Sequence, residues 1–273
     1  MIVDLQTPIA PAVAVDRLIQ QGFATLTPEA LAQLAGLSLA QLDALHPHWA
    51  ALPPDRHLKD GGRYRHRRHG CYVQTLPQNL ARCDLSALSA GLQATPHRAH
   101  WQPTTYNALH GGMERWFDPL EPELAANPSW TTLIAAIGGL FAQRRAPEDG
   151  RWWIETHPFR IDTRDGVGRP TPEGAHRDGV DFVAVLLVER HAVIGGETRV
   201  FEAGGTGGVR FTLQRPWSAL LLDDARVVHE STPIQPADAN GQPLPPEAVA
   251  REGHRDTLVL TYRSGGFQAP GGR

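Results

Sequence analysis

The chain has 273 residues, of which 41% are hydrophobic, and this is enough for one large domain with a sizeable core. Its formal charge of −3 gives no overall attraction to nucleic acid or to an anionic membrane. Two cysteines, Cys71 and Cys83, exclude a disulfide framework. There is no convincing signal peptide and no 18-residue apolar run, so we expect a cytoplasmic protein that does not span a membrane.

The first part of the chain is expected to be rich in helices. Leucines recur at roughly helical spacing between residues 31 and 45, after a Thr27-Pro28-Glu29 start signal with Thr as the N-cap. A further helix is predicted over 129–145, capped by Ser129, although two internal glycines weaken it. Residues 70–110 have a mixed pattern that predicts no order of elements.

After Gly150 the chain changes to short runs that favour strands, separated by glycine- and proline-rich turns. The runs are RWWIETHPFRI, DFVAVLLVER, ETRVFEA, VRFTLQ, SALLLDD, RVVHEST and DTLVLTYR. Strands at this spacing predict a sandwich, jelly roll or barrel. We therefore expect one mainly β domain over 1–273, with a helix-rich flanking part (1–150) and a β core (151–273). The 204–208 glycine run is expected to be a hairpin turn, and 235–253 an exposed loop.

The tripeptide His-Arg-Asp occurs twice, each time before an apolar run. Protein kinases use the same tripeptide, but they need an asparagine five residues later, where this chain has Val183 and Thr261. In the first copy, His176 and Asp178 point the same way if the segment is extended, so both can reach one metal ion. His229, in VVHEST, is the expected third ligand. Two histidines and one carboxylate form the facial triad of non-haem Fe(II) oxygenases, which leaves positions open for a co-substrate and oxygen.

The second copy is expected to bind the co-substrate. Arg255 and Thr257 lie two residues apart at the start of the last predicted strand, so they share one face. An arginine holds a carboxylate by a bidentate pair, and a nearby hydroxyl adds a third bond. An oxygenase that consumes 2-oxoglutarate needs such an anchor.

From about residue 150 onward the sequence resembles the Fe(II)/2-oxoglutarate-dependent dioxygenases. It is most similar to the bacterial group that contains free L-isoleucine hydroxylases and a biofilm-stress-motility protein. The resemblance is carried by HPFRI (157–161), RPTPEGAHRDGVDFV (169–183), IGGETRVF (194–201), VVHEST (227–232) and RDTLVLTYR (255–263). It implies a double-stranded β-helix, or jelly roll, and a requirement for Fe(II), 2-oxoglutarate and O2. Family members often place the anchoring arginine closer to the last histidine, which leaves Arg263 as a rival to Arg255.

The resemblance also suggests a free amino acid, or a similar small polar molecule, as the substrate. Arg160 is then a candidate for its carboxylate and Glu173 for its ammonium group. Three alternatives stay open: a hydroxylase or demethylase of a macromolecule, a non-catalytic metal- or metabolite-binding sensor, and a metal-dependent isomerase of the cupin type. The sequence gives no oligomeric state.

Several other polar motifs are expected to have ordinary structural roles. RYRHRRHG (63–70) resembles a nucleic-acid patch, but a solvated face or a lid over the barrel mouth fits the net charge better. Asp223-Asp224 is expected to be a turn pair, with a small chance of supporting a ligand. Three histidine pairs have metal-like spacing but no carboxylate or cysteine context, and we expect them to be structural or exposed: His46/His48, His66/His69 and His97/His100.

Overall fold

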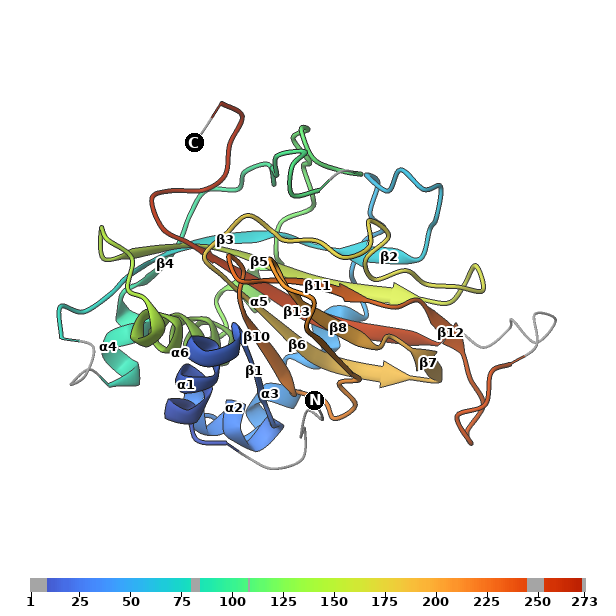
Figure 1. Ribbon diagram of the computed structural model, residues 1–273, viewed down its shortest axis with the longest axis horizontal. Helices are drawn as coiled ribbons and strands as arrows, with labels where there is room; N and C mark the ends of the chain where they lie inside the picture. The colour runs from blue at the N-terminus through green and yellow to red at the C-terminus, as the bar shows by residue number, and fades with distance from the viewer. Residues whose placement is uncertain (1–8, 80–83, 108, 245–252, 272–273) are drawn as a thin grey trace.

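The computed structural model describes residues 9–79, 84–107, 109–244 and 253–271. It is built around an eight-stranded sheet in which seven strands follow the order β1-β10-β6-β13-β5-β3-β4 and β2 pairs with β5 (Figure 1). The strands are β1 (Phe23–Leu26), β2 (Arg65–Arg67), β3 (Gly70–Thr75), β4 (Leu92–Ala94), β5 (Arg151–Asp162), β6 (Phe182–His191), β10 (Ala219–Asp223) and β13 (His254–Arg263). All the pairings in this sheet are antiparallel.

Smaller sheets cover one face of this large sheet. One has the order β11-β8-β9, and β12 pairs with β7 in another. Their strands are β7 (Val193–Gly195), β8 (Thr198–Glu202), β9 (Gly208–Phe211), β11 (Val227–Ser231) and β12 (Ile234–Pro236). Val183 and Leu222 of the large sheet share a buried apolar cluster with Val200 and Val209 of the β11-β8-β9 sheet. Two antiparallel sheets packed on a common core are the arrangement of a jelly roll.

Helices pack against another part of the large sheet and gather at one side of the molecule (Figure 1). They are α1 (Pro11–Gln21), α2 (Pro28–Ala35), α3 (Leu39–Asp43), the 3-10 helix η1 (His46–Trp49), α4 (Leu85–Ala90), α5 (Pro122–Ala125) and α6 (Pro128–Arg144). The ring of Phe141 on α6 stacks on Phe182 of β6 at 4.6 Å between centroids. The mainly β class with flanking helices is confirmed.

The glycine pair in α6 has a packing reason. A Cβ atom on Gly138 would lie 2.0 Å from Oε1 of Gln74, and the carbonyl of Gly138 accepts a hydrogen bond from the indole of Trp152. Close approach of the helix to the sheet therefore requires glycine here, at the usual cost in helix propensity.

The first 150 residues contribute more β structure than expected. Four strands, β1 to β4, come from this part and join the same sheet as the strands of the second part. The seven strand-like runs after Gly150 all form strands, and the 204–208 turn joins β8 to β9 as expected. Part of the expected 235–253 loop instead forms β12, and residues 245–252 lie outside the described residues. Within the described ranges, no helix is both long and apolar enough to cross a membrane.

The helix starts were predicted with one error. Thr27 caps α2 as expected, because its hydroxyl accepts a hydrogen bond from the amide of Ala30. Helix α6, however, is capped by Asn127 and not by Ser129: the Asn127 side-chain oxygen accepts from the amides of Ser129 and Trp130. Pro128 occupies the first helical turn, which places the cap one residue before it.

We expect Asn127→Ala to lower the free energy of unfolding by about 1 kcal/mol, because two helix amides lose their acceptor. Ser129→Ala is the matched control and should change it by less than about 0.5 kcal/mol. Urea unfolding of both variants measures the difference. A larger loss for Ser129→Ala would contradict the cap assignment.

Candidate metal centre

The structure brings His176, Asp178 and His229 together. His176 precedes β6 and forms an antiparallel bridge with His229 of β11, through backbone hydrogen bonds of 3.0 and 2.9 Å. The Nε2 atoms of both imidazoles lie 4.0 Å from the carboxylate oxygens of Asp178. One donor atom of each side chain lies within 4.8 Å of the others. This spacing allows all three to bind one metal ion.

Hydrogen bonds and neighbouring charges act differently on the two imidazoles. Nδ1 of His176 lies 3.0 Å from the carbonyl oxygen of Gly174, which only accepts, so Nδ1 carries a proton and the neutral form has its lone pair on Nε2. Burial disfavours the charged form of His176, but the carboxylates of Asp178 and Glu173 outweigh this and raise its pKa. Burial and the neighbouring His176 hold the pKa of His229 well below its ordinary value. His229 is therefore neutral, as a ligand must be.

The side chains of Gln102 and Asp224 hold Asp178 in place by hydrogen bonds. The side-chain amide of Gln102 donates a 3.1 Å hydrogen bond to its Oδ1 atom. The carboxylate of Asp224 accepts hydrogen bonds of 2.8 to 3.1 Å from the backbone amides of Asp178, Gly179 and Val180. Burial and the nearby Asp178 raise the pKa of Asp224 to about 7. Asp224 thus supports a ligand, the less favoured of the two roles weighed for the Asp223-Asp224 pair.

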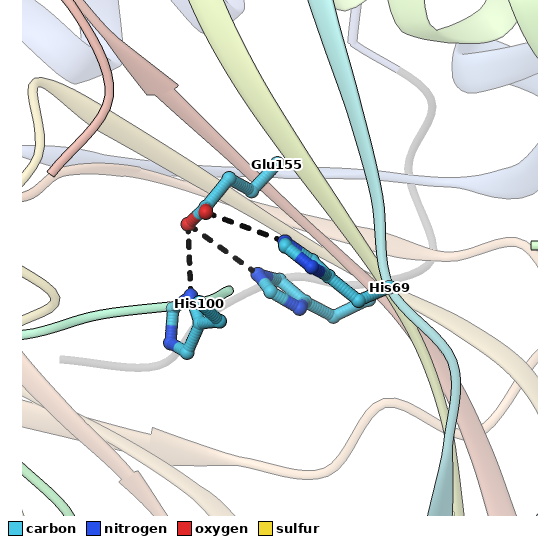
Figure 2. Close-up of side chains that lie close together, drawn as sticks. His69, His100 and Glu155 are labelled. Atoms are coloured by element: carbon cyan, nitrogen blue, oxygen red, sulfur yellow. Dashed lines mark hydrogen bonds and ion pairs between the residues drawn. The ribbon is translucent and has the colours of Figure 1, made fainter. Parts of the chain in front are cut away.

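A second buried group also has the donors for a metal ion: His69, His100, Glu155 and His157. Figure 2 shows the Glu155 carboxylate facing the imidazoles of His69 and His100, with separations of 3.3 and 2.9 Å. Nε2 of His157 lies 3.9 Å from the same carboxylate. Nδ1 of His157, however, accepts a 2.6 Å hydrogen bond from the Arg67 guanidinium, which has no lone pair to offer. A neutral His157 therefore carries its proton on Nε2, the nitrogen that faces the Glu155 carboxylate.

A third group, His46, Glu189 and Asp256, satisfies the same distance test. Its Asp256 carboxylate is already held by Arg160, and its Glu189 accepts from His254. These contacts are those of a partly exposed ion-pair network.

A cavity of about 120 Å³ opens onto the first group and is lined by both parts of the chain. From the C-terminal part come Phe159 and Ile161 of β5, Arg255 and Thr257 of β13, Glu173, and the three candidate ligands. From the N-terminal part come Arg65, Arg67, His100, Gln102, Asn107 and Arg115. The N-terminal part therefore forms one wall of the cavity.

The two rival arginines on β13 lie in different places. Arg255 is 3% exposed, lines the cavity, and has no hydrogen-bond partner for Nε or Nη2. Burial, together with Arg190, lowers its pKa to about 10, which still leaves it charged at neutral pH. Arg263 sits at the other end of the strand, in a separate depression beside Phe267. Both residues lie on the same face of β13 because they are an even number of positions apart, but only Arg255 lines the cavity.

Arg160 does not reach the cavity, and its expected role is corrected. The cavity face of β5 carries Phe159 and Ile161, so the residue between them points to the opposite face. There the Arg160 guanidinium is bound at two points by the carboxylate of Asp256, at 2.8 and 2.6 Å. Glu173 does line the cavity, with Oε1 3.8 Å from Nε2 of His176 and no partner for Oε2.

Most of the RYRHRRHG segment is buried, contrary to the expected solvated face, and only Arg63 is exposed. Arg65, Arg67 and His69 are at most 5% exposed and lie on β2 or directly after it. Arg65 forms a 2.7 Å ion pair with Asp55. All three residues of β2 are buried, so the alternation of arginine and histidine did not indicate in the sequence which face meets the cavity.

The histidine pairs have carboxylate partners that their sequence context did not show, so their structural or exposed role stays a prediction. His48 pairs with Glu121 and His66 with Asp162. His69 and His100 both contact Glu155, and His100 also lines the cavity. Their carboxylate partner comes from β5, far away in the sequence, so the spacing of the pairs could not indicate it.

A protein-family model described as 2OG-Fe dioxygenase matches residues 46–261. The chain belongs to this dioxygenase family. A crystal structure of a bsmA homolog from Methylobium petroleophilum has 59% sequence identity over 99% of each chain, with a TM-score of 0.85. Two more distant structures share the fold. IDO from Bacillus thuringiensis has 15% sequence identity over 97% of this chain and 100% of that chain, with a TM-score of 0.69. The Fe(II)/α-ketoglutarate-dependent dioxygenase TqaL has 19% identity over 93% of this chain and 87% of that chain, with a TM-score of 0.63. No curated protein matches the chain.

Family membership makes the protein a 2-oxoglutarate-dependent dioxygenase with a jelly-roll fold. The family uses Fe(II), 2-oxoglutarate and O2, so all three are the cofactors and co-substrates of this chain.

We expect Asp224→Asn to weaken Fe(II) binding by about 10- to 100-fold, because the loop that carries Asp178 loses a carboxylate that accepts three amides. Asp223→Asn is the matched control: its carboxylate pairs with Arg144, away from the ligands, and Fe(II) affinity should not change. Anaerobic Fe(II) titration of both variants measures the affinities. Equal affinities in the two variants would show that Asp224 does not position the site.

Proposed function

We propose that the protein hydroxylates a free L-amino acid, or a similar small polar molecule, at an iron held by His176, Asp178 and His229. The observation that carries this proposal is the pairing of two features in one cavity. Two imidazoles and a carboxylate converge at one place, and the buried guanidinium of Arg255, with unpartnered N–H groups, faces the same space.

The iron is assigned to this group and not to the second one, because the Glu155 carboxylate of the second group is already in contact with the imidazoles of His69 and His100. His176 donates through Nδ1 to a carbonyl, which directs its Nε2 lone pair at the metal position. His157 has the opposite arrangement, because Arg67 donates to its Nδ1. When bound, iron supplies the oxidation that turns 2-oxoglutarate, O2 and a C–H bond into succinate, CO2 and a C–OH group.

The side chains of β13 would hold 2-oxoglutarate. Arg255 offers two unpartnered nitrogen atoms, and a planar guanidinium fits a carboxylate. Thr257, two residues along the strand, is 3% exposed and lines the same cavity. We assign the distal carboxylate of 2-oxoglutarate to this pair, in preference to Arg263, because Arg263 lies in a different depression.

A small substrate is favoured over a macromolecule. The N-terminal wall, with Gln102, Asn107 and Arg115, lies over the cavity. The basic segment that would have lined a nucleic-acid groove is buried. Glu173 lies beside the metal position with Oε2 unpartnered, and we assign it to an ammonium group of the substrate. A cytoplasmic location and the absence of nucleic-acid or membrane partners remain part of the proposal.

The proposal is tested by succinate formation with Fe(II), ascorbate, 2-oxoglutarate and air, in the presence of each free L-amino acid in turn. We expect succinate and a product heavier by one oxygen atom with at least one of them, and neither product with His176→Ala. Succinate without an oxygenated amino acid would move the substrate to another class of molecule. Fe(II) binding without any succinate would favour the non-catalytic sensor.

The co-substrate anchor is tested by Arg255→Gln, with Arg263→Gln as the matched control. Loss of charged hydrogen bonds to the distal carboxylate should raise the KM for 2-oxoglutarate by at least about 10-fold. Arg263→Gln should leave this KM unchanged. The opposite result would return the role to Arg263.

A further inference from the structure

We propose that Arg65, Arg67 and Arg115 form a second acid-binding subsite, which holds the carboxylate of the substrate while Arg255 holds 2-oxoglutarate. The inference rests on the proposed function and replaces the role expected for Arg160. It assigns the recognition of the substrate's carboxylate to the N-terminal part of the chain.

Each of the three arginines is buried and has an unused donor. Their exposed fractions are 5%, 4% and 2%, and all three line the cavity. Arg65 contacts Asp55 through Nε and leaves Nη2 without a partner. Arg67 and Arg115 bond through Nη2 to His157 and Gln102, and each leaves Nε without a partner. Buried N–H groups without acceptors are rare in folded proteins unless a ligand or water completes them.

The charge of the cluster is also incompletely balanced. Arg65 has Asp55 as its counter-ion, but among the described residues no carboxylate forms an ion pair with Arg67 or Arg115. Burial lowers the pKa of Arg115 to about 10, so it remains charged at neutral pH. Long basic side chains are almost never fully buried without a partner. An anion in the cavity would supply the missing acceptor and the missing charge together.

Glu155 is not that acceptor, because its carboxylate is occupied by the neighbouring imidazoles (Figure 2). Glu155 instead organises the wall behind the arginines. His157, close to Glu155, accepts from the Arg67 guanidinium, which also lies over the rings of Phe117 and Phe159 at 3.7 and 4.3 Å. A guanidinium fixed in this way loses little entropy on binding a carboxylate.

The strand register separates this subsite from the 2-oxoglutarate anchor. Arg65 and Arg255 both pair with Ile161, on opposite sides of β5. Their Cα atoms are therefore two strand spacings apart, roughly 10 Å. One cavity thus has two cationic positions, which suits two separate carboxylates better than two bonds to the same one. Glu173 and Arg115 both line the cavity, so an acidic and a basic group face the space where an amino acid would lie.

The experiment compares binding of free L-amino acids with binding of their carboxamides, which lack only the acid charge. The protein carries Fe(II) and 2-oxoglutarate and is kept anaerobic, so that binding is read by calorimetry without turnover. For each acid that binds, we expect the carboxamide to bind about 10- to 100-fold more weakly. Equal affinities for acid and carboxamide, or no binding by any acid, would overturn the inference.

Arg67→Gln tests whether the arginine cluster binds the acid group. The variant should bind the acid more weakly, with an affinity close to that for the carboxamide, and its affinity for the carboxamide should hardly change. The ratio of the two affinities should therefore fall towards one. Arg68→Gln is the matched control, because Arg68 contacts Pro119 and Glu121 outside the cavity, and it should keep the full discrimination. Discrimination that survives in Arg67→Gln would place the acid elsewhere.

The same measurement separates failure of this inference from failure of the proposed function. If acids bind more tightly than their carboxamides but give no succinate, the proposed hydroxylation is contradicted and the proposed subsite is retained. Hydroxylation of acids and carboxamides with equal kcat/KM would retain the enzyme function and remove the subsite.

Discussion

The pairing of β5 with β13 is the contact on which the rest of the site depends. Its antiparallel register runs without interruption from His254–Asp162 to Arg263–Trp153. Because side chains alternate along both strands, this one register directs His157, Phe159 and Ile161 to the same face as Arg255 and Thr257. A slip by one residue would put Arg255 on the opposite face from Phe159 and Ile161, so either Arg255 would leave the cavity or Arg160 would enter it beside Arg255. The opposite face of β5 and β13 binds Arg160 to Asp256 and so favours the observed register.

The metal group depends on a second local constraint, the backbone bridge between His176 and His229. It fixes two candidate ligands by main-chain hydrogen bonds, so their position does not rely on side-chain packing alone. The third candidate ligand, Asp178, is buried close to a second carboxyl group, that of Asp224. Burying two carboxylates together is unfavourable unless a proton or a cation compensates them. A divalent ion between the three ligands would relieve that repulsion.

Residues whose geometry is local could be predicted from the sequence. His176 and Asp178 are two apart in an extended segment, and Arg255 and Thr257 repeat that relation, so their shared faces followed from strand parity alone. Arg160 was assigned wrongly because parity says which residues share a face but not which face meets the cavity. The α6 cap was misplaced by two residues because Ser129 and Asn127 are both good caps, and the choice depends on where Pro128 lies in the first turn.

The N-terminal wall could not be predicted in the same way, because it is made by long-range pairing. Nothing near Arg67 in the chain indicates that β2 will add to β5, or that His157 and Phe159 will surround its guanidinium. Without those partners a run of arginines and histidines is most simply a solvated surface. Because these residues are buried in the sheet, they instead indicate a binding site, since an anion in the cavity would balance their charge. The features that made the segment look exposed are therefore the ones that assign it to ligand recognition.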